Sequence, residues 1–244
     1  MAGIDSAARP PKGANSAPTG GSAAAVAASV GGRFRLRGLY AVTRDDEDTA
    51  RMAAQVEAAL AGGASAIQYR NKKAPPPLAH AQAAALAALC RERGALLIVN
   101  DDATLAREVD ADGVHVGEDD PDLPAVRSIV GPSKIVGVSC YDDLDRARRL
   151  VAQGADYIAF GSFFTSQVKP GARRADVALV APARALGVPV VAIGGITAAN
   201  APVLAKAGVD AVAVISDLFA RDDLAAVTRA AAAIAACFPQ GGRP

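Results

Sequence analysis

Short apolar runs alternate with longer stretches rich in alanine and leucine from about Phe34 to the end of the chain. The short runs are continuously apolar, which is typical of strands buried on both faces in a parallel sheet. They predict strands at residues 39–43, 66–70, 96–100, 113–116, 135–139, 157–160, 190–193 and 211–215. The longer stretches predict helices near residues 46–61, 76–93, 102–109, 121–130, 142–153, 175–186, 198–207 and 223–237.

Eight such strand–helix units in about 205 residues fit a single α/β domain, a (β/α)8 or TIM barrel. A doubly wound parallel sheet is the alternative architecture. The first strand–helix turn, Thr43-Arg44-Asp45-Asp46, argues against it because it has no glycine-rich dinucleotide loop.

The first 32 residues differ from the rest and consist mainly of Ala, Gly, Ser and Pro. With almost no large apolar side chains, this segment cannot bury enough surface to offset the entropy lost on ordering. We therefore expect a disordered tail at residues 1–32, followed by a catalytic barrel domain at residues 33–240.

Composition narrows the classes of partner. Apolar residues make up 51% of the chain, but there is no Trp and there are only 4 Tyr and 6 Phe, which argues against base-stacking nucleic-acid modules. The 26 basic and 25 acidic residues nearly balance, and no apolar run is long enough to span a membrane. We expect a cytoplasmic protein that binds small molecules, without nucleic acid or membrane; whether it forms a homo-oligomer is left open.

Polar residues follow the predicted strands at the ends where such a barrel carries its chemistry. The second strand runs into Gln68-Tyr69-Arg70-Asn71-Lys72 and the third into Asn100-Asp101-Asp102. The acidic run 118–120 follows the fourth strand, and Lys169 follows the sixth. Because carboxylates hold Mg²⁺ and basic side chains hold phosphate oxygens, this combination predicts a metal-bound diphosphate.

Small residues follow the last two strands. Gly194-Gly195 comes after the seventh strand and Ile215-Ser216 ends the eighth. These are the loops in which barrels commonly bind a phosphate through backbone N–H groups. One monophosphate and one metal-bound diphosphate together predict a transferase with diphosphate as its leaving group.

Several of these residues also have structural interpretations. We expect Asp102 to cap the helix that follows it, while Asp101 points into the barrel mouth. The acidic run 118–120 could cap a helix that begins at Pro121. His115 lies in an apolar strand and is interpreted as a hydrogen-bonded core residue.

From about Leu36 to Cys237 the chain resembles the thiamine phosphate synthase family. The resemblance is carried by segments whose order and spacing agree, namely 39–43, 68–72, 99–102, 111–117 with Asp120, 137–139, 159–161 with Lys169, and 193–197. It implies that a hydroxymethylpyrimidine diphosphate and a thiazole phosphate, the latter with or without a carboxylate, are joined into thiamine phosphate. Diphosphate leaves first, and the thiazole nitrogen then captures a pyrimidine methylene cation.

The resemblance also implies the site residues. Those on the pyrimidine diphosphate side are Gln68, Tyr69, Arg70, Asn71, Lys72, Asn100, Ser139 and Lys169. Those on the thiazole phosphate side are Ser166, Gln167, Val168, Gly195, Ile215 and Ser216. Asp101 and Asp120 are implied to bind one Mg²⁺, and the residues implied to be catalytic are Arg70, Lys72, Ser139 and Lys169.

The sequence departs from the family pattern at three positions. Tyr141 stands where family members often have His, Glu118 where they have Gln, and Val168 where they have a hydroxyl residue. Two other functions stay open, a thiazole tautomerase of the same fold and a non-catalytic protein that binds thiamine phosphates. Neither would need two carboxylates and three cations around a leaving diphosphate, so the synthase is favoured.

Overall fold

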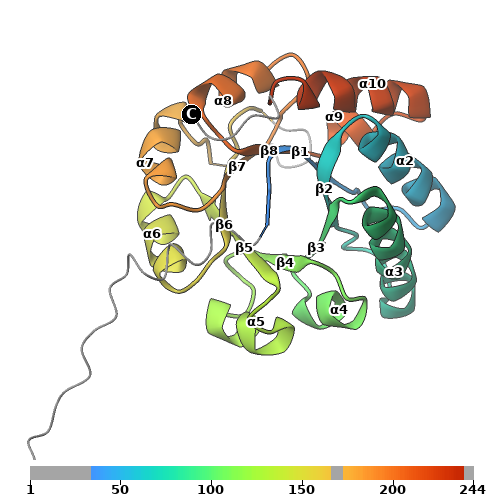
Figure 1. The fold of residues 1–244 in the computed structure, drawn as a ribbon, viewed down its shortest axis with the longest axis horizontal. Coiled ribbons are helices and arrows are strands. Elements are labelled where there is room, and N and C mark those ends of the chain that lie inside the picture. Colours follow the sequence, from blue (N-terminus) through green and yellow to red (C-terminus); the bar gives the residue numbers. More distant parts are fainter. Residues whose placement is uncertain (1–33, 166–172, 239–244) are drawn as a thin grey trace, which may run out of the picture.

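The computed structural model describes residues 34–165 and 173–238 of the 244-residue chain. Its parallel strands close into one barrel in sequence order, and β1 pairs with both β2 and β8 (Figure 1). The strands are β1 Gly38–Val42, β2 Ala64–Tyr69, β3 Leu96–Asn100, β4 Gly113–Val116, β5 Ile135–Tyr141, β6 Tyr157–Phe160, β7 Val190–Ile193 and β8 Ala211–Val214. Closure through β1 and β8 confirms the (β/α)8 barrel and excludes the doubly wound sheet.

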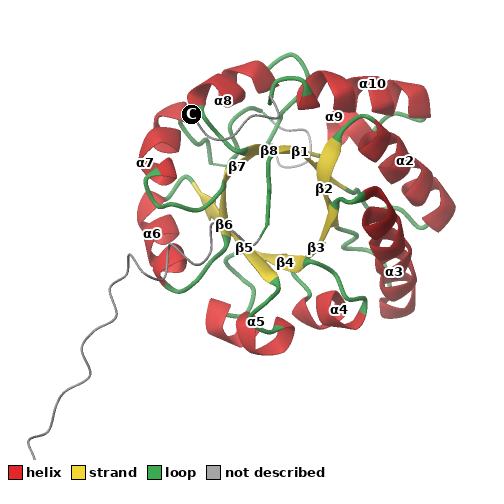
Figure 2. Ribbon diagram, viewed as in Figure 1, coloured by secondary structure: helices red, strands yellow, loops and turns green. Residues whose placement is uncertain are grey.

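Helices form a ring outside the strands (Figure 2). The α-helices are α2 Thr49–Ala61, α3 Pro76–Arg93, α4 Ala103–Glu108, α5 Leu123–Val130, α6 Leu144–Ala152, α7 Val180–Arg184, α8 Ala201–Ala207, α9 Ser216–Phe219 and α10 Leu224–Ala235. A 3₁₀ turn at Val177–Leu179 precedes α7, so the helix predicted at 175–186 is shorter than expected. The short helix α9 is not predicted from the sequence pattern.

Two apolar layers share the strands, because alternate side chains of a strand point to opposite faces. The outer layer packs strand residues such as Ile67 and Val99 against the helices. The inner layer fills the barrel with small side chains, including Ala66 and Ala213, around the larger Tyr40. Polar side chains near the ends of the inward-facing rows therefore come together at the barrel mouth, defined here as the carboxyl ends of the strands and the loops after them.

A repeated Asp before three of the strands has a structural role. The carboxylates of Asp112, Asp156 and Asp210 accept hydrogen bonds, each 2.8 Å long, from the backbone N–H groups of Leu97, Val136 and Val190 respectively. Each carboxylate thus ties the start of one strand to the start of its neighbour. The recurrent Ala-Asp or Val-Asp step before these strands is explained by strand alignment.

The end of the barrel opposite the mouth is covered by the first described residues. The segment 34–37 crosses this end (Figure 1), and Leu36, 3% exposed, packs into the inner layer with Phe34 against it. Phe34 lines a cavity there with Leu96 and Ile135, which stand at strand starts. The chain upstream of Phe34, including the tail expected at residues 1–32, lies outside the described residues.

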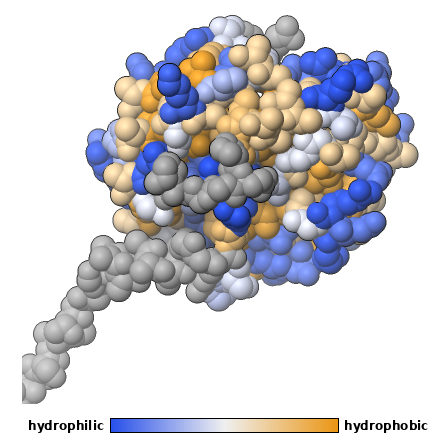
Figure 3. Space-filling model, turned by 45° about the horizontal axis from the view of Figure 1, so that its top comes forward, coloured by the Kyte–Doolittle hydropathy of each residue, from blue (hydrophilic) through white to orange (hydrophobic). Residues whose placement is uncertain are grey.

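The face drawn in Figure 3 shows groups of hydrophilic side chains mainly toward its margins, with apolar ones between them. Such a mixture is ordinary for a folded domain. Within the described ranges, no helix combines the length and the hydropathy that a bilayer crossing requires.

Candidate active site

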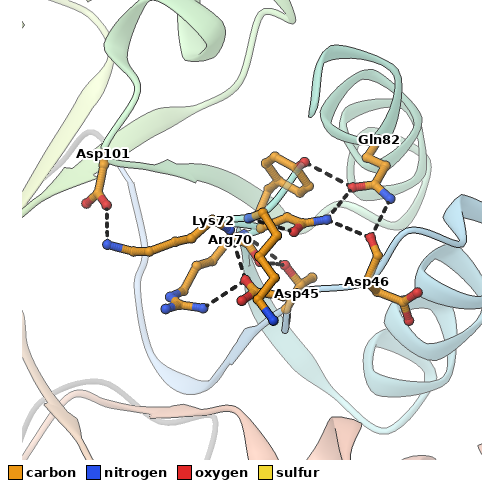
Figure 4. Close-up of polar contacts among 10 residues, drawn as sticks. Asp45, Asp46, Arg70, Lys72, Gln82 and Asp101 are labelled. Atoms are coloured by element: carbon orange, nitrogen blue, oxygen red, sulfur yellow. Dashed lines mark hydrogen bonds and ion pairs between the residues drawn. The ribbon is translucent and has the colours of Figure 1, made fainter. Parts of the chain in front are cut away.

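Lys72 and Asp101 form an ion pair at adjoining strand exits of the barrel mouth. Nζ of Lys72, at the exit of β2, lies 2.9 Å from Oδ2 of Asp101, at the exit of β3 (Figure 4). The Lys72 side chain is 56% exposed, so its ammonium group is accessible to a ligand. This pair brings a cation from one strand end together with a carboxylate from the next.

Asp45, in the loop after β1, holds both basic residues at the end of β2. Its Oδ1 lies 3.3 Å from Nη1 of Arg70 and accepts the backbone N–H of Lys72 at 2.9 Å (Figure 4). Thr43 fixes the same turn, since its hydroxyl accepts the N–H of Arg70 and donates to the carbonyl oxygen of Arg70. The cationic exit is therefore braced by the first loop.

Asp101 and Asp120 lie next to each other although they follow different strands. Asp101 adopts a left-handed backbone with φ of 64°, and its N–H donates to the His115 carbonyl at 2.8 Å. Asp120 folds back onto its own loop and accepts the Gly117 N–H at 2.6 Å. Burial raises the pKa of the Asp120 carboxyl, the Gly117 N–H lowers it, and the neighbouring Asp101 carboxyl raises it again by charge and hydrogen bonding.

This pair suits a divalent cation that shares its coordination with a ligand. Among the residues that the structure describes, no group of three or more His, Cys, Asp or Glu side chains is placed to enclose a metal. Mg²⁺ in phosphate-processing sites is typically held by one or two carboxylates together with substrate phosphates and water. Asp101 and Asp120 fit that arrangement better than an all-protein cage.

The loop that carries Asp120 is clamped by Tyr141 and Arg146. The Tyr141 hydroxyl accepts the backbone N–H of Glu118 at 3.3 Å. The Arg146 guanidinium lies 5.9 Å from the centre of the Tyr141 ring, and its Nη2 donates to the Gly117 carbonyl at 3.2 Å. Tyr141, one of the three departures from the family pattern, thus supports the loop that carries Asp120 from β5. The helix after this loop is capped by Asp122, so the expectation of a cap within 118–120 is wrong.

A buried chain of hydrogen bonds crosses the barrel interior beneath the mouth. Nε2 of Gln68 donates to the Tyr40 hydroxyl at 2.8 Å, and the Tyr40 and Tyr157 hydroxyls are 3.0 Å apart. Nδ1 of His115 lies 2.9 Å from the Tyr157 hydroxyl, and Nε2 of His115 lies 2.9 Å from Oγ of Ser139. We call these five side chains the relay.

The relay joins two predicted site residues, Gln68 and Ser139. The connection runs through Tyr40, Tyr157 and His115, which are not predicted to contact a substrate. His115 is the hydrogen-bonded core residue expected from the sequence, and burial lowers its pKa to about 4. The sequence does not identify Tyr40 and Tyr157 as part of the site. One sequence signal was available: Gly137 in β5, where a Cβ would stand 1.9 Å from the Tyr157 ring, leaves the space that this ring fills.

Tyr69 and Asn71 do not direct their side chains to the mouth. The Tyr69 hydroxyl donates to Oε1 of Gln82 in α3 at 3.0 Å, on the helix side of β2. Nδ2 of Asn71 donates to the same oxygen at 3.0 Å and to the Asp46 carbonyl at 2.6 Å (Figure 4). These side chains fasten the β2 exit to α3 and to the loop after β1. Asn100, another predicted site residue, is half-buried at the end of β3.

The loops after β6 and β7 cross at Gly194 and Gly195. Both glycines have positive φ, 103° and 64°, and a Cβ on Gly195 would stand 2.3 Å from the Thr165 carbonyl oxygen. The Phe164 N–H donates to the Gly194 carbonyl at 3.0 Å. Glycine is needed here for backbone shape and for close approach, in addition to any contact with a ligand.

The exit of β8 provides the second half of the expected phosphate site. Ile215 ends the turn, and Ser216 opens α9, whose first N–H groups have no partner within the helix. Asp217 of α9 accepts the Ala198 N–H at 3.0 Å, which ties this exit to the loop after β7. The two loops predicted to hold a phosphate are therefore adjacent. The remaining expected site residues, Ser166, Gln167, Val168 and Lys169, lie outside the described residues.

Comparison with known proteins shows which family the chain is similar to. The model of a family described as thiamine monophosphate synthase matches residues 39–218. A thiamine-phosphate synthase of Thiobacillus denitrificans is 58% identical over 196 residues, covering 80% of this chain and 92% of that protein. One from Methylobacillus flagellatus is 54% identical over 194 residues, covering 80% and 93%.

A solved structure gives the same result. The chain superposes on a thiamine phosphate pyrophosphorylase from Pyrococcus furiosus with a TM-score of 0.73 and 36% identity, over 82% of this chain and 94% of that one. Barrel architecture and sequence similarity therefore extend over the same part of the molecule.

Proposed function

The chain belongs to the thiamine monophosphate synthase family, and from this premise we propose how its barrel mouth makes thiamine phosphate. The function is thiamine-phosphate synthesis, a transferase reaction of thiamine biosynthesis. The two substrates are a 4-amino-2-methyl-5-hydroxymethylpyrimidine diphosphate and a 4-methyl-5-(2-phosphoethyl)thiazole. The observation that carries the proposal is the cluster of Lys72, Asp101 and Asp120 at adjoining strand exits.

The diphosphate of the first substrate binds at the cluster of Lys72, Asp101 and Asp120, with Arg70 beside it at the exit of β2. Asp101 and Asp120 would hold one Mg²⁺, whose positive charge would stabilise the negative charge that develops on the leaving diphosphate. Arg70 and Lys72 bind diphosphate oxygens, and Asp45 keeps both residues in place. Lys169 completes this cationic set, as the family resemblance implies.

The pyrimidine ring is bound deeper in the mouth, by Gln68, Asn100 and Ser139. Gln68 and Ser139 face the barrel interior from β2 and β5, and the relay holds both. Tyr69 and Asn71 support this site by fastening the β2 exit rather than by contacting the ring.

The phosphate of the thiazole substrate is bound by the loops after β7 and β8. Gly195 and Ser216 offer backbone N–H groups, and Ile215 gives an apolar contact to the thiazole. Ser166, Gln167 and Val168 are assigned to the same subsite by the family resemblance.

The reaction is dissociative. The C–O bond to diphosphate breaks with its electron pair leaving on oxygen, and the thiazole nitrogen then gives its lone pair to the pyrimidine methylene carbon. No proton has to be removed in these two steps, so no general base is needed. Ser139 contacts His115, but the other imidazole nitrogen faces Tyr157 rather than a carboxylate, unlike a hydrolase triad. The protein contributes charge placement and exclusion of water. We place this activity in the cytoplasm.

A coupled assay for diphosphate release tests the function. With both substrates and Mg²⁺ present, we expect release that requires each component and falls at least about 100-fold in Lys72→Ala, because one cation facing the leaving group is lost. A tautomerase would convert the thiazole substrate alone, and a binding protein would release no diphosphate. Either of those results would reject the proposed function.

A further inference from the structure

Three members of the relay have no part in the reaction as proposed. Tyr40, Tyr157 and His115 are buried, and among the described residues each forms side-chain hydrogen bonds only to other members of the relay. The Tyr40 and Tyr157 rings meet edge to face with centroids 6.2 Å apart, and the His115 ring stacks on Tyr157 at 5.5 Å. Their positions are thus fixed by packing as well as by hydrogen bonding.

The direction of the hydrogen bonds follows from the Gln68 amide. Its Nε2 can only donate, so the Tyr40 oxygen accepts that proton and turns its own O–H toward Tyr157. The Tyr157 oxygen accepts in turn and directs its O–H to Nδ1 of His115. The Tyr40 and Tyr157 hydroxyls then each accept one hydrogen bond and donate one.

The hydrogen bond from His115 to Ser139 has the same direction. Because Nδ1 accepts the Tyr157 proton, a neutral ring must carry its own proton on Nε2, which faces Oγ of Ser139 at 2.9 Å. Both ring nitrogens face hydroxyl oxygens, so neither is paired with a carboxylate. The Ser139 oxygen accepts from His115, and its own O–H is left to donate elsewhere.

We propose that the relay is polarised from Gln68 to Ser139 and so sets the hydrogen-bonding character of the pyrimidine subsite. Ser139 presents a donor, and Gln68 presents its carbonyl oxygen Oε1, for which the described residues supply no partner. Reversing the Gln68 amide would reverse each bond and turn Ser139 into an acceptor. Tyr40, Tyr157 and His115 are therefore positioning residues.

The polarity matches an aminopyrimidine, and this reading rests on the proposed function. An exocyclic amino group donates and needs an acceptor, whereas the ring nitrogens accept and need a donor. The relay offers one of each from opposite sides of the barrel. A 4-oxo pyrimidine, which carries an acceptor in place of the amino group, would face the Gln68 oxygen with another oxygen and should be rejected.

The tautomer of His115 tests the polarity without substrates. The chain has two histidines, and His80 lies exposed on α3, so a His80→Gln variant leaves His115 as the only imidazole signal in ¹⁵N NMR. We expect a neutral ring with its proton on Nε2 and a bare Nδ1. A ring protonated on Nδ1 would overturn the proposed direction, whatever the activity of the protein.

Kinetics of Tyr40→Phe and Tyr157→Phe test the positioning role. Each variant removes one hydroxyl, so that either the Gln68 amide or the His115 imidazole loses a hydrogen-bond partner. We expect KM for the pyrimidine diphosphate to rise about 10-fold, which corresponds to the loss of one hydrogen bond. KM for the thiazole phosphate should stay constant. Discrimination against the 4-oxo analogue should fall by a similar factor in Tyr40→Phe.

Thr228→Val is the matched control, because it removes a hydroxyl that bonds the Ala58 carbonyl far from the relay. If both tyrosine variants show the same two KM values as this control, the positioning role is wrong. If the native protein releases no diphosphate at all, the proposed function fails, and the NMR result still decides the polarity.

Discussion

At the scale of single residues, the cations of the mouth depend on a carboxylate that has no place in the reaction. Asp45 contacts the Arg70 guanidinium and accepts the Lys72 N–H from outside the proposed diphosphate subsite. Lys72 is in turn shared with Asp101. Alternating charge of this kind keeps cations together in advance of the ligand, so their mutual repulsion is already offset before diphosphate arrives.

The buried His115 should make stability depend on pH. Burial lowers its pKa to about 4, while an unfolded histidine titrates near 6.5. The unfolded state therefore binds more protons below pH 6.5, and the free energy of unfolding should fall by about 2 kcal/mol between pH 7 and pH 5. Urea titrations at several pH values measure this slope.

A His115→Gln variant should lose most of that slope, whereas His80→Gln, at an exposed position, should keep it. An equal slope in native protein and in His115→Gln would contradict a neutral, buried imidazole.

Residue type and strand position predicted the mouth, but not the direction of every side chain in it. Gln68 and Tyr69 are consecutive, and strand alternation sends the first inward and the second to Gln82 of α3. The family resemblance implies that both are site residues, and it does not indicate that their side chains point in opposite directions. The relay could not be predicted, because Tyr40 and Tyr157 are 117 positions apart and meet only when the barrel closes.

At the scale of elements, strands were easier to predict than the helices around them. The β3, β4, β6 and β7 bounds agree with the apolar runs, since continuous burial leaves a clear pattern. Helix starts depend on capping: Asp102 caps α4 as expected, whereas Asp48 delays α2 to Thr49. The four-residue helix α9 is too short to show a helical period.

The crossing of the β6 and β7 loops should be sensitive to one methyl group. Gly195→Ala would force a Cβ against the Thr165 carbonyl, so the loops must separate. We expect KM for the thiazole phosphate to rise at least about 10-fold, with KM for the pyrimidine diphosphate unchanged, because only one subsite moves. Steady-state kinetics with each substrate varied in turn measure both values.

Gly187→Ala provides the matched control. Gly187 also has a positive φ, 83°, but nothing lies within 4 Å of its added Cβ. It should lose stability from backbone strain without a change in either KM. A Gly195→Ala enzyme that behaves like this control would move the thiazole phosphate site elsewhere.

At the scale of the whole molecule, the two ends of the barrel differ in purpose. The strand exits gather the charged and polar groups of the site, whereas the strand starts are tied together by aspartates and covered by Phe34 and Leu36. This division is common to barrels of the fold. It also places the start of the described chain away from the chemistry.

Deleting residues 1–30 should leave kcat and both KM values within about two-fold of the full chain, because Phe34 and Leu36 remain to cover the far end. The comparison requires only steady-state assays of the two proteins. A loss of ten-fold or more would show that the upstream segment takes part in the site, contrary to this arrangement.

The claim on which the mechanism depends is that Asp101 and Asp120 share one metal ion with a diphosphate. Electron paramagnetic resonance of Mn²⁺, used in place of Mg²⁺, measures this directly with inorganic diphosphate as the ligand. We predict tight Mn²⁺ binding only when diphosphate is present, weakened at least about 10-fold in Asp101→Asn and in Asp120→Asn, and unchanged in the exposed neighbour variant Glu118→Gln. Mn²⁺ binding that is equally strong in all four proteins would contradict the account.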